Sequence, residues 1–175
     1  YQAGRGFEYG SLYSGAQMLA ARIVGAEIRI ARDHASFSSI TPWTGALLAW
    51  AMPIQAAAIL AVCVASIRRA DGDAVRDASA AVLALIATGK VFSPQYLIWL
   101  LPLLCVLEGP IAPRARRLFL VIGAATLLAP ALLNVTSRTS LAVILAYNAR
   151  NVLVVALLSV LVVGPPRRAS PNAFG

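Results

Sequence analysis

Long unbroken runs of apolar residues are the feature that most limits how this chain can fold. Residues 44–67 form one run of 24 residues, and residues 141–163 form another. A helix of about 20 apolar residues crosses the roughly 30 Å hydrocarbon core of a bilayer. Hydrophobic residues make up 59% of the chain and charged residues 13%, against about 45–50% and 25% in soluble domains. We therefore expect an all-α fold, a polytopic transmembrane helical bundle.

Shorter apolar stretches lie between these two runs. Two stretches of 12 residues, 78–89 and 96–107, flank the polar turn 90–95, and one of 16 residues follows at 118–133. A 12-residue helix rises only about 18 Å, which is too short to cross the membrane. The two stretches form either a hairpin of short helices that enters and leaves on one side, or one long, broken span.

The positions of the arginines discriminate between these topologies. Eight arginines lie in three polar regions: the loop 68–77 (Arg68, Arg69, Arg76), the loop 108–117 (Arg114, Arg116, Arg117) and the tail 164–175 (Arg167, Arg168). Cytoplasmic loops are enriched in Lys and Arg, so we place all three regions in the cytoplasm, which favours the hairpin. Residues 1–43 and the turns 90–95 and 134–140 then share one extracytoplasmic face. Arginines spread in this way do not indicate a nucleic-acid partner.

Residues 1–43 are mixed in polarity, and we expect them to form an extracytoplasmic loop with an amphipathic helix. An apolar stripe at helical spacing contains Leu12, Ala16, Leu19, Ile23, Ala26 and Ile30, and the opposite side contains Arg22, Arg29 and Arg32. Such a helix lies either on the membrane surface or against loops of its own protein. The two cysteines, Cys63 and Cys105, stand inside apolar runs without metal-ligand spacing, so we expect them to be packing residues.

The turn 90–95 is the first place to look for function. Lys90 is the lone lysine of the chain and interrupts an apolar stretch. An ionisable group at membrane depth indicates a functional site, and a cation at the bilayer surface suits a lipid phosphate; the alternative is a lysine that only reaches the interface. Pro94 ends the turn and restricts Ser93 to extended angles, so Ser93 is a candidate helix N-cap.

A second candidate segment lies near the start of the chain. Arg5 and Glu8 are three residues apart, just before the amphipathic stripe. Arg5 could hold a phosphate and Glu8 could act as a general base, although an ordinary surface ion pair explains both residues more simply. Farther along, Arg150 with Asn148 and Asn151 interrupts the last apolar run, where a charge is costly unless it reaches a partner.

Two strings of residues together resemble a known family. Lys90-Val-Phe-Ser-Pro-Gln-Tyr-Leu-Ile-Trp-Leu-Leu-Pro102 is similar to the Lys-x-x-Ser-Pro-Gln-Tyr-x-x-Trp-x-x-Pro signature of glycosyltransferase family 87, the C-type enzymes typified by bacterial polyprenol-phosphate-mannose-dependent mannosyltransferases. The segment from Arg5 to Ser11 resembles the family's Arg-Gly-Leu-Gln-x-Glu-Ser, with Glu8 in place of Gln and Gly10 in place of Glu. The resemblance covers roughly residues 1–163 and implies the C-terminal part of a longer protein.

The resemblance implies a hexosyltransferase of the mannosyl type in the bacterial plasma (inner) membrane. It would move a sugar from a polyprenyl-phosphate donor to a glycan or glycolipid acceptor on the extracytoplasmic face. Lys90 and Arg5 would serve the lipid phosphate, with Ser93, Gln95 and Tyr96 near the sugar or the turn. Enzymes of this type take their catalytic acid from an early external loop, which we expect to be missing here, so the catalytic residue is unassigned and Glu8 is only a weak candidate. We expect no cofactor and no metal.

Two other classes of function compete with this reading. A transporter or flippase also uses short broken helices and cations near the membrane midplane, but it should show an inverted repeat, and we see none in the sequence. A purely structural membrane scaffold should tolerate apolar residues in place of Lys90 and Gln95. The two classes therefore differ from the transferase in features that can be tested.

Overall fold

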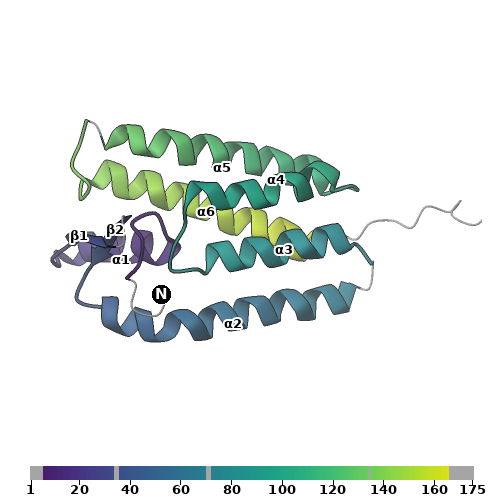
Figure 1. Cartoon of the computed structure of the whole chain (residues 1–175), viewed down its shortest axis with the longest axis horizontal. Helices are drawn as coiled ribbons and strands as arrows, with labels where there is room; N and C mark the ends of the chain where they lie inside the picture. The colour runs from purple at the N-terminus through teal and green to yellow at the C-terminus, as the bar shows by residue number, and fades with distance from the viewer. Residues whose placement is uncertain (1–5, 34–35, 70–71, 134, 166–175) are drawn as a thin grey trace, which may run out of the picture.

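The fold is mainly helical, as expected, with one small β-hairpin in addition (Figure 1). The computed structural model describes residues 6–33, 36–69, 72–133 and 135–165. In chain order its elements are α1 (Leu12–Val24), β1 (Arg29–Asp33), β2 (Ser36–Ile40), α2 (Thr44–Arg69), α3 (Ala74–Ala87), the short 3-10 helix η1 (Pro94–Tyr96), α4 (Leu97–Val106), α5 (Ala112–Leu132) and α6 (Leu141–Val163).

Three helices of the described residues are long and apolar enough to cross a membrane. They are α2, α5 and α6, with 26, 21 and 23 residues. The bounds of α6 coincide with the apolar run 141–163, whereas α5 begins six residues before the stretch 118–133, at Ala112. The arginine-containing segment 114–117, expected in a loop, is thus the first part of a helix. By length and composition this is an integral membrane protein.

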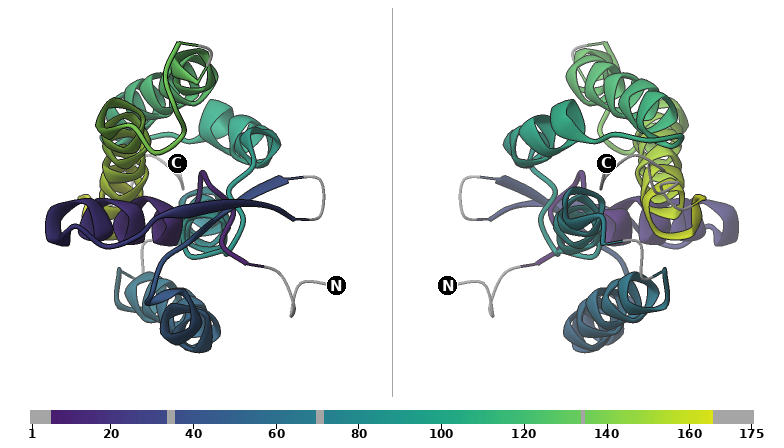
Figure 2. Two further views of the ribbon diagram at one scale, coloured as in Figure 1. Left: turned by 90° about the vertical axis from the view of Figure 1, so that its left-hand side faces the viewer. Right: turned by 90° about the vertical axis from the view of Figure 1, so that its right-hand side faces the viewer.

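The helices run between two ends of the molecule that differ in composition. Segment 6–11, α1, the β-hairpin, the turn 88–96 and the α5–α6 connection gather at one end, which we call the strand end. The connections α2–α3 and α4–α5 and the end of α6 lie at the other, which we call the arginine end. Figure 2 shows α1 and the hairpin lying across the strand end rather than along the bundle.

The segment 74–106 forms a hairpin of two short helices, not a single broken span. Helices α3 and α4 pack against each other and run in opposite directions, so the turn 88–96 lies at the strand end (Figure 1). The core of the bundle lies between α3, α4, α5 and α6 and includes the fully buried Leu83, Leu100, Ile122 and Leu157. Helix α2 is mostly exposed along its length, which suits a helix that faces lipid or another protein.

The prediction that the two cysteines are packing residues is wrong. Both Cys63 and Cys105 are exposed on the outside of the helices. In a membrane-spanning helix, an apolar run continues around the whole circumference, because the outer face contacts lipid chains. An apolar surrounding sequence therefore does not show which side chains face the core.

The amphipathic helix is shorter than its periodicity indicates, and its predicted apolar stripe is only partly buried. Helix α1 ends at Val24, because Gly25 adopts a left-handed conformation (φ 71°) and caps it, and residues 29–40 form the β-hairpin instead. Ala16 and Ile23 of the predicted stripe are exposed, whereas Ser14 and Gln17 are buried. The fold is therefore mostly helical with one small two-stranded sheet, and the buried side of α1 is mixed, because Tyr13, Met18 and Ala21 are buried beside Ser14 and Gln17.

A buried polar network explains this orientation of α1. The Gln17 amide Nε2 donates to Ser39 O (2.9 Å) and Oγ (2.7 Å), and its Oε1 accepts from Thr41 Oγ1 (3.1 Å) and Thr44 Oγ1 (2.9 Å). Buried polar groups are stable only when they are hydrogen-bonded. The network therefore fixes α1 against β2 and the start of α2, and leaves the side with Ala16 and Ile23 exposed.

Several arginines at the arginine end have structural partners. Arg76 is 1% exposed and donates to the carbonyl oxygens of Leu161 (2.6 Å), Gly164 (2.5 Å) and Pro165 (2.9 Å) at the end of α6. Arg116 similarly donates to the last carbonyls of α4. Cations at helix C-termini satisfy unpaired carbonyls and oppose the negative end of the helix dipole. Some of the arginines used to assign topology thus also cap helices.

Candidate functional site

The turn 88–96 is held in place by segment 7–9, which lies between the turn and β2. Tyr9 N donates to Phe37 O (2.7 Å) on the strand side, and Glu8 N donates to Lys90 O (2.9 Å) on the turn side. The Glu8 carboxylate then accepts from Phe92 N (2.6 Å). The two segments singled out in the sequence, around residue 8 and around residue 90, are therefore in direct contact.

The turn has the backbone expected from Ser93-Pro94, but not the expected cap. Ser93 is extended (φ −91°, ψ 142°), and Pro94 occupies the first turn of η1. Within the described part of the chain the Ser93 side chain makes no capping hydrogen bond, and Tyr96 N donates to the Ser93 backbone carbonyl (3.0 Å). Ser93 therefore occupies the N-cap position of η1, as expected, but without the side-chain hydrogen bond of a cap, and it lines a cavity described below.

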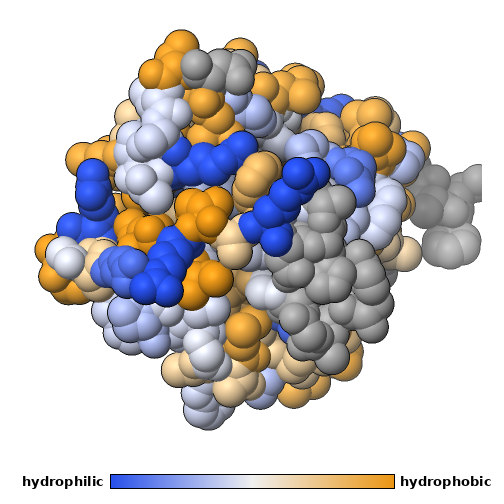
Figure 3. Space-filling model, turned by 60° about the vertical axis from the view of Figure 1, so that its left-hand side comes forward, coloured by the Kyte–Doolittle hydropathy of each residue, from blue (hydrophilic) through white to orange (hydrophobic). Residues whose placement is uncertain are grey.

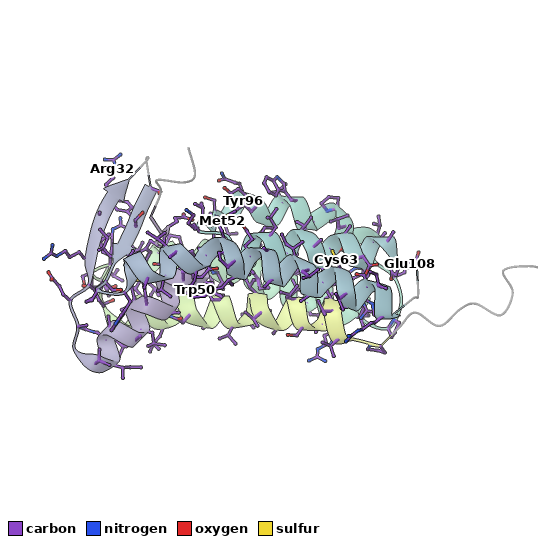
Figure 4. All side chains as sticks on the ribbon, turned by 90° about the horizontal axis from the view of Figure 1, so that it is seen from below. Arg32, Trp50, Met52, Cys63, Tyr96 and Glu108 are labelled. Atoms are coloured by element: carbon purple, nitrogen blue, oxygen red, sulfur yellow. The ribbon has the colours of Figure 1, made fainter. Side chains whose placement is uncertain are left out.

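A groove opens on one side of the turn, between α2 and the α3–α4 hairpin. It has a volume of about 250 Å³, and Lys90 and Tyr96 lie in its wall with Met52 of α2 and Trp99 of α4. Figure 4 shows Met52 and Tyr96 near each other, with Trp50 on the other side of α2. Most other lining residues are apolar or small, so the groove combines one cationic side chain with an apolar wall that continues onto exposed helix surface.

A second cavity, of about 290 Å³, lies on the other side of the turn. Segment 8–10, the start of β2, residues 92–94 and the strand-end parts of α5 and α6 enclose it. Its charged side chains are Glu8, Arg138 and Arg150, and Ser93 and Tyr147 also line it. We call it the arginine cavity; it lies at the strand end of the molecule, not at the arginine end. Figure 3 shows strongly hydrophilic side chains around hydrophobic ones on the surface of this end.

Arg150 has partners within the protein for part of its guanidinium group, although it stands in an apolar run. Its side chain is 2% exposed, and Nη2 donates to Gly10 O and to Asn151 Oδ1 (2.7 Å). The guanidinium also lies 4.1 Å from the centre of the Phe92 ring. This arginine therefore connects α6 both to segment 8–10 and to the turn 88–96.

Tyr9 lines the arginine cavity and is hydrogen-bonded through its backbone to β2 of the β-hairpin. Its hydroxyl donates to Arg138 O, and its ring meets the Tyr147 ring edge-on at 5.1 Å. Burial raises the pKa of Tyr9 to about 12, with Tyr147 adding to the rise and the Arg138 guanidinium opposing it. Tyr9 is consequently a neutral donor at physiological pH.

The structure brings together most of the residues predicted for the site, but on two sides of the turn. Lys90 and Tyr96 line the groove, whereas Glu8 and Ser93 line the arginine cavity. Gln95 is exposed and lines neither of them. Arg5 lies outside the described residues.

Two residues of the arginine cavity were missed by the sequence analysis. Arg138 stands in a polar connection, where an arginine is unremarkable, and Tyr147 stands in an apolar run, where an aromatic residue is ordinary. Arg150 did carry a signal, because a charge inside an apolar run requires a partner. The partners themselves, Gly10 and Phe92, are 140 and 58 residues away in sequence and could not be read from the local pattern.

Comparison of the chain with protein-family models, with curated proteins and with solved structures gives no match.

Proposed function

We propose that this chain is part of a membrane glycosyltransferase of the mannosyltransferase type that takes a sugar from a polyprenyl-phosphate donor. The acceptor would be a glycan or glycolipid on the extracytoplasmic face of a bacterial plasma membrane, and the strand end would be that face. The observation that carries the proposal is the groove beside the turn, where Lys90 lies in a largely apolar wall between α2 and α4. The motif that surrounds Lys90 supports the same reading.

The groove has the two properties that a lipid phosphate requires. An ammonium group is a point charge that binds phosphate, and the wall with Met52 and Trp99 is apolar and continues onto surface that a bilayer would cover. A prenyl chain would lie along this wall, with its phosphate at Lys90. Tyr96, which also lines the groove, would contact the phosphate or the sugar.

The role of Lys90 in the reaction would be electrostatic. An acceptor hydroxyl attacks the anomeric carbon, the bond from that carbon to the phosphate oxygen breaks, and the hydroxyl proton passes to a base. The lipid phosphate leaves with an additional negative charge, which a nearby cation stabilises. The base is unassigned. Glu8 lies on the other side of the turn with its carboxylate bonded to Phe92 N, which supports a positioning role for Glu8 instead.

The test is transfer of labelled mannose from a polyprenyl-phosphate donor by the complete protein in membranes. We expect at least a tenfold fall in rate for Lys90→Ala, about 1.4 kcal/mol of barrier, and partial recovery in Lys90→Arg. The matched control is Arg22→Ala, which removes an exposed cation on α1 at the same end. An unchanged rate in Lys90→Ala would remove the site assignment, and absence of transfer from any such donor would favour the transporter or scaffold instead.

A further inference from the structure

The arginine cavity contains more hydrogen-bond donors than its own residues use. The Arg150 guanidinium has five N–H donors, and its hydrogen bonds to described residues, those to Gly10 and Asn151, both come from Nη2. Its Nε is buried and has no acceptor among the described residues. A buried donor without a partner costs about 1–3 kcal/mol, so an unfilled donor on an arginine that is 2% exposed indicates a missing partner.

Arg138 brings a second guanidinium to the same cavity. Its guanidinium lies 3.7 Å from the centre of the Phe37 ring, and its hydrogen bond within the described chain uses the backbone oxygen of Arg138, not the side chain. Stacking on a ring covers the flat face of a guanidinium and leaves its in-plane N–H groups available. Arg150 is oriented in the same way by Phe92.

The charges of the cavity favour an anion. Two guanidinium groups, of Arg138 and Arg150, face one carboxylate, that of Glu8. The Glu8 carboxylate already accepts from Phe92 N, and Tyr9 and Tyr147 are neutral hydrogen-bonding groups at neutral pH. A purely structural role, in which Arg150 attaches α6 to Gly10, accounts for Nη2. It accounts neither for Nε nor for the second arginine.

We propose that the arginine cavity binds a phosphate-bearing headgroup, with Arg138 and Arg150 as its ligands. Arginine recognises phosphate through paired N–H donors. The cavity has a volume of about 290 Å³, which is enough for a phosphate-bearing headgroup, and its two guanidinium groups, not its size, indicate the phosphate. This site is separate from the groove at Lys90 and does not depend on the proposed transferase. If that proposal holds, the cavity is the place for an anionic acceptor.

The test uses two probes that present the same chemistry from different sources. Phosphatidylglycerol binding to the detergent-purified protein is counted by native mass spectrometry, and glycerol 1-phosphate binding is measured by calorimetry. We expect Arg138→Gln to weaken binding at least tenfold and Arg22→Gln, which changes the net charge equally, to leave it unchanged. Arg138 makes no side-chain hydrogen bond to described residues, so its replacement should not disturb folding, and Arg150→Lys gives a second variant that keeps the charge.

Each outcome of this test has one meaning. Arg138-dependent binding of phosphatidylglycerol alone supports a site for a lipid headgroup, and Arg138-dependent binding of both probes supports a site that also takes a soluble phosphate. Equal weakening by Arg138→Gln and Arg22→Gln would show only general attraction to a basic protein and would overturn the proposal. Failure of both probes to bind would also overturn it. Neither probe carries a prenyl chain or a transferable sugar, so the result is independent of the transfer assay.

Discussion

A methyl group added at Gly15 should destabilise the protein although Gly15 lies inside a helix. Helices α1 and α6 pack together there, and Asn148 Nδ2 donates to Gly15 O (3.0 Å). A Cβ at Gly15 would lie 2.8 Å from Asn151 Nδ2 and 3.0 Å from Asn148 Oδ1, closer than nonbonded atoms approach. Both asparagines would have to move.

The size of the change in the free energy of unfolding follows from one stabilising term and two destabilising terms. Alanine is favoured over glycine in a helix interior by about 1 kcal/mol. Against this, overpacking costs about 1–3 kcal/mol. Displacing Asn151 also weakens its bond to Ser11 O (3.3 Å) and its bond from Arg150 (2.7 Å), each worth about 1 kcal/mol. We expect Gly15→Ala to lower the free energy of unfolding by about 1–3 kcal/mol.

The assay is denaturant unfolding of the protein in micelles, with Gly123→Ala as the matched control. A Cβ at Gly123, in α5, meets no atom of the described residues within 4 Å, so this variant should be as stable as the wild type or gain up to about 1 kcal/mol. Adding Asn151→Ala to Gly15→Ala should cost less than the sum of the two single changes, because it removes the clash. The reasoning is refuted if Gly15→Ala is stabilised in the same way as Gly123→Ala.

Two further predictions concern the two ends of the molecule. Arg76→Met should lower the free energy of unfolding by about 2–4 kcal/mol, because it leaves buried carbonyls at the end of α6 without donors. The control Arg114→Met, at an exposed position, should change the free energy of unfolding by less than about 0.5 kcal/mol. Equal effects of the two substitutions would contradict the capping role of Arg76. Burial raises the pKa of Tyr9 from 10.0 to about 12, so the unfolded tyrosine loses its proton at lower pH than the folded one. The contribution of Tyr9 to the free energy of unfolding is therefore fully present below about pH 10 and is lost as the pH rises toward 12. In a pH series over this range, the unfolding midpoint of Tyr9→Phe should fall less steeply than that of the wild type. Identical slopes would count against the burial of this hydroxyl.

The long helices could be predicted from the sequence because their signal is local. A run such as 141–163 contains its own evidence, since its hydropathy and length are those of a membrane-spanning helix. The β-hairpin and the orientation of α1 could not be predicted in this way. They depend on Gln17 reaching Ser39, Thr41 and Thr44, and nothing in the spacing of these residues indicates that they meet.

For the candidate site, single residues could be predicted from the sequence, but their arrangement could not. Lys90 and Arg150 could be selected because a charge in an apolar run requires an explanation. The division of the site into a groove and a cavity could not be predicted, because it depends on segment 7–9 lying between β2 and the turn 88–96, far from either in sequence. Arg138 can be recognised as a candidate site residue only from the structure, which places its guanidinium over the Phe37 ring.

The most direct test of the central claim is photo-crosslinking of a labelled polyprenyl phosphate to α2. Met52 lines the groove, whereas Trp50 is equally exposed (63%, against 64% for Met52) but does not line it. With benzoylphenylalanine at position 52, we predict several-fold more crosslinking than at position 50, and loss of this excess in Lys90→Ala. Equal crosslinking at the two positions, unaffected by Lys90→Ala, would show only lipid around a membrane helix and would contradict a donor site in this groove.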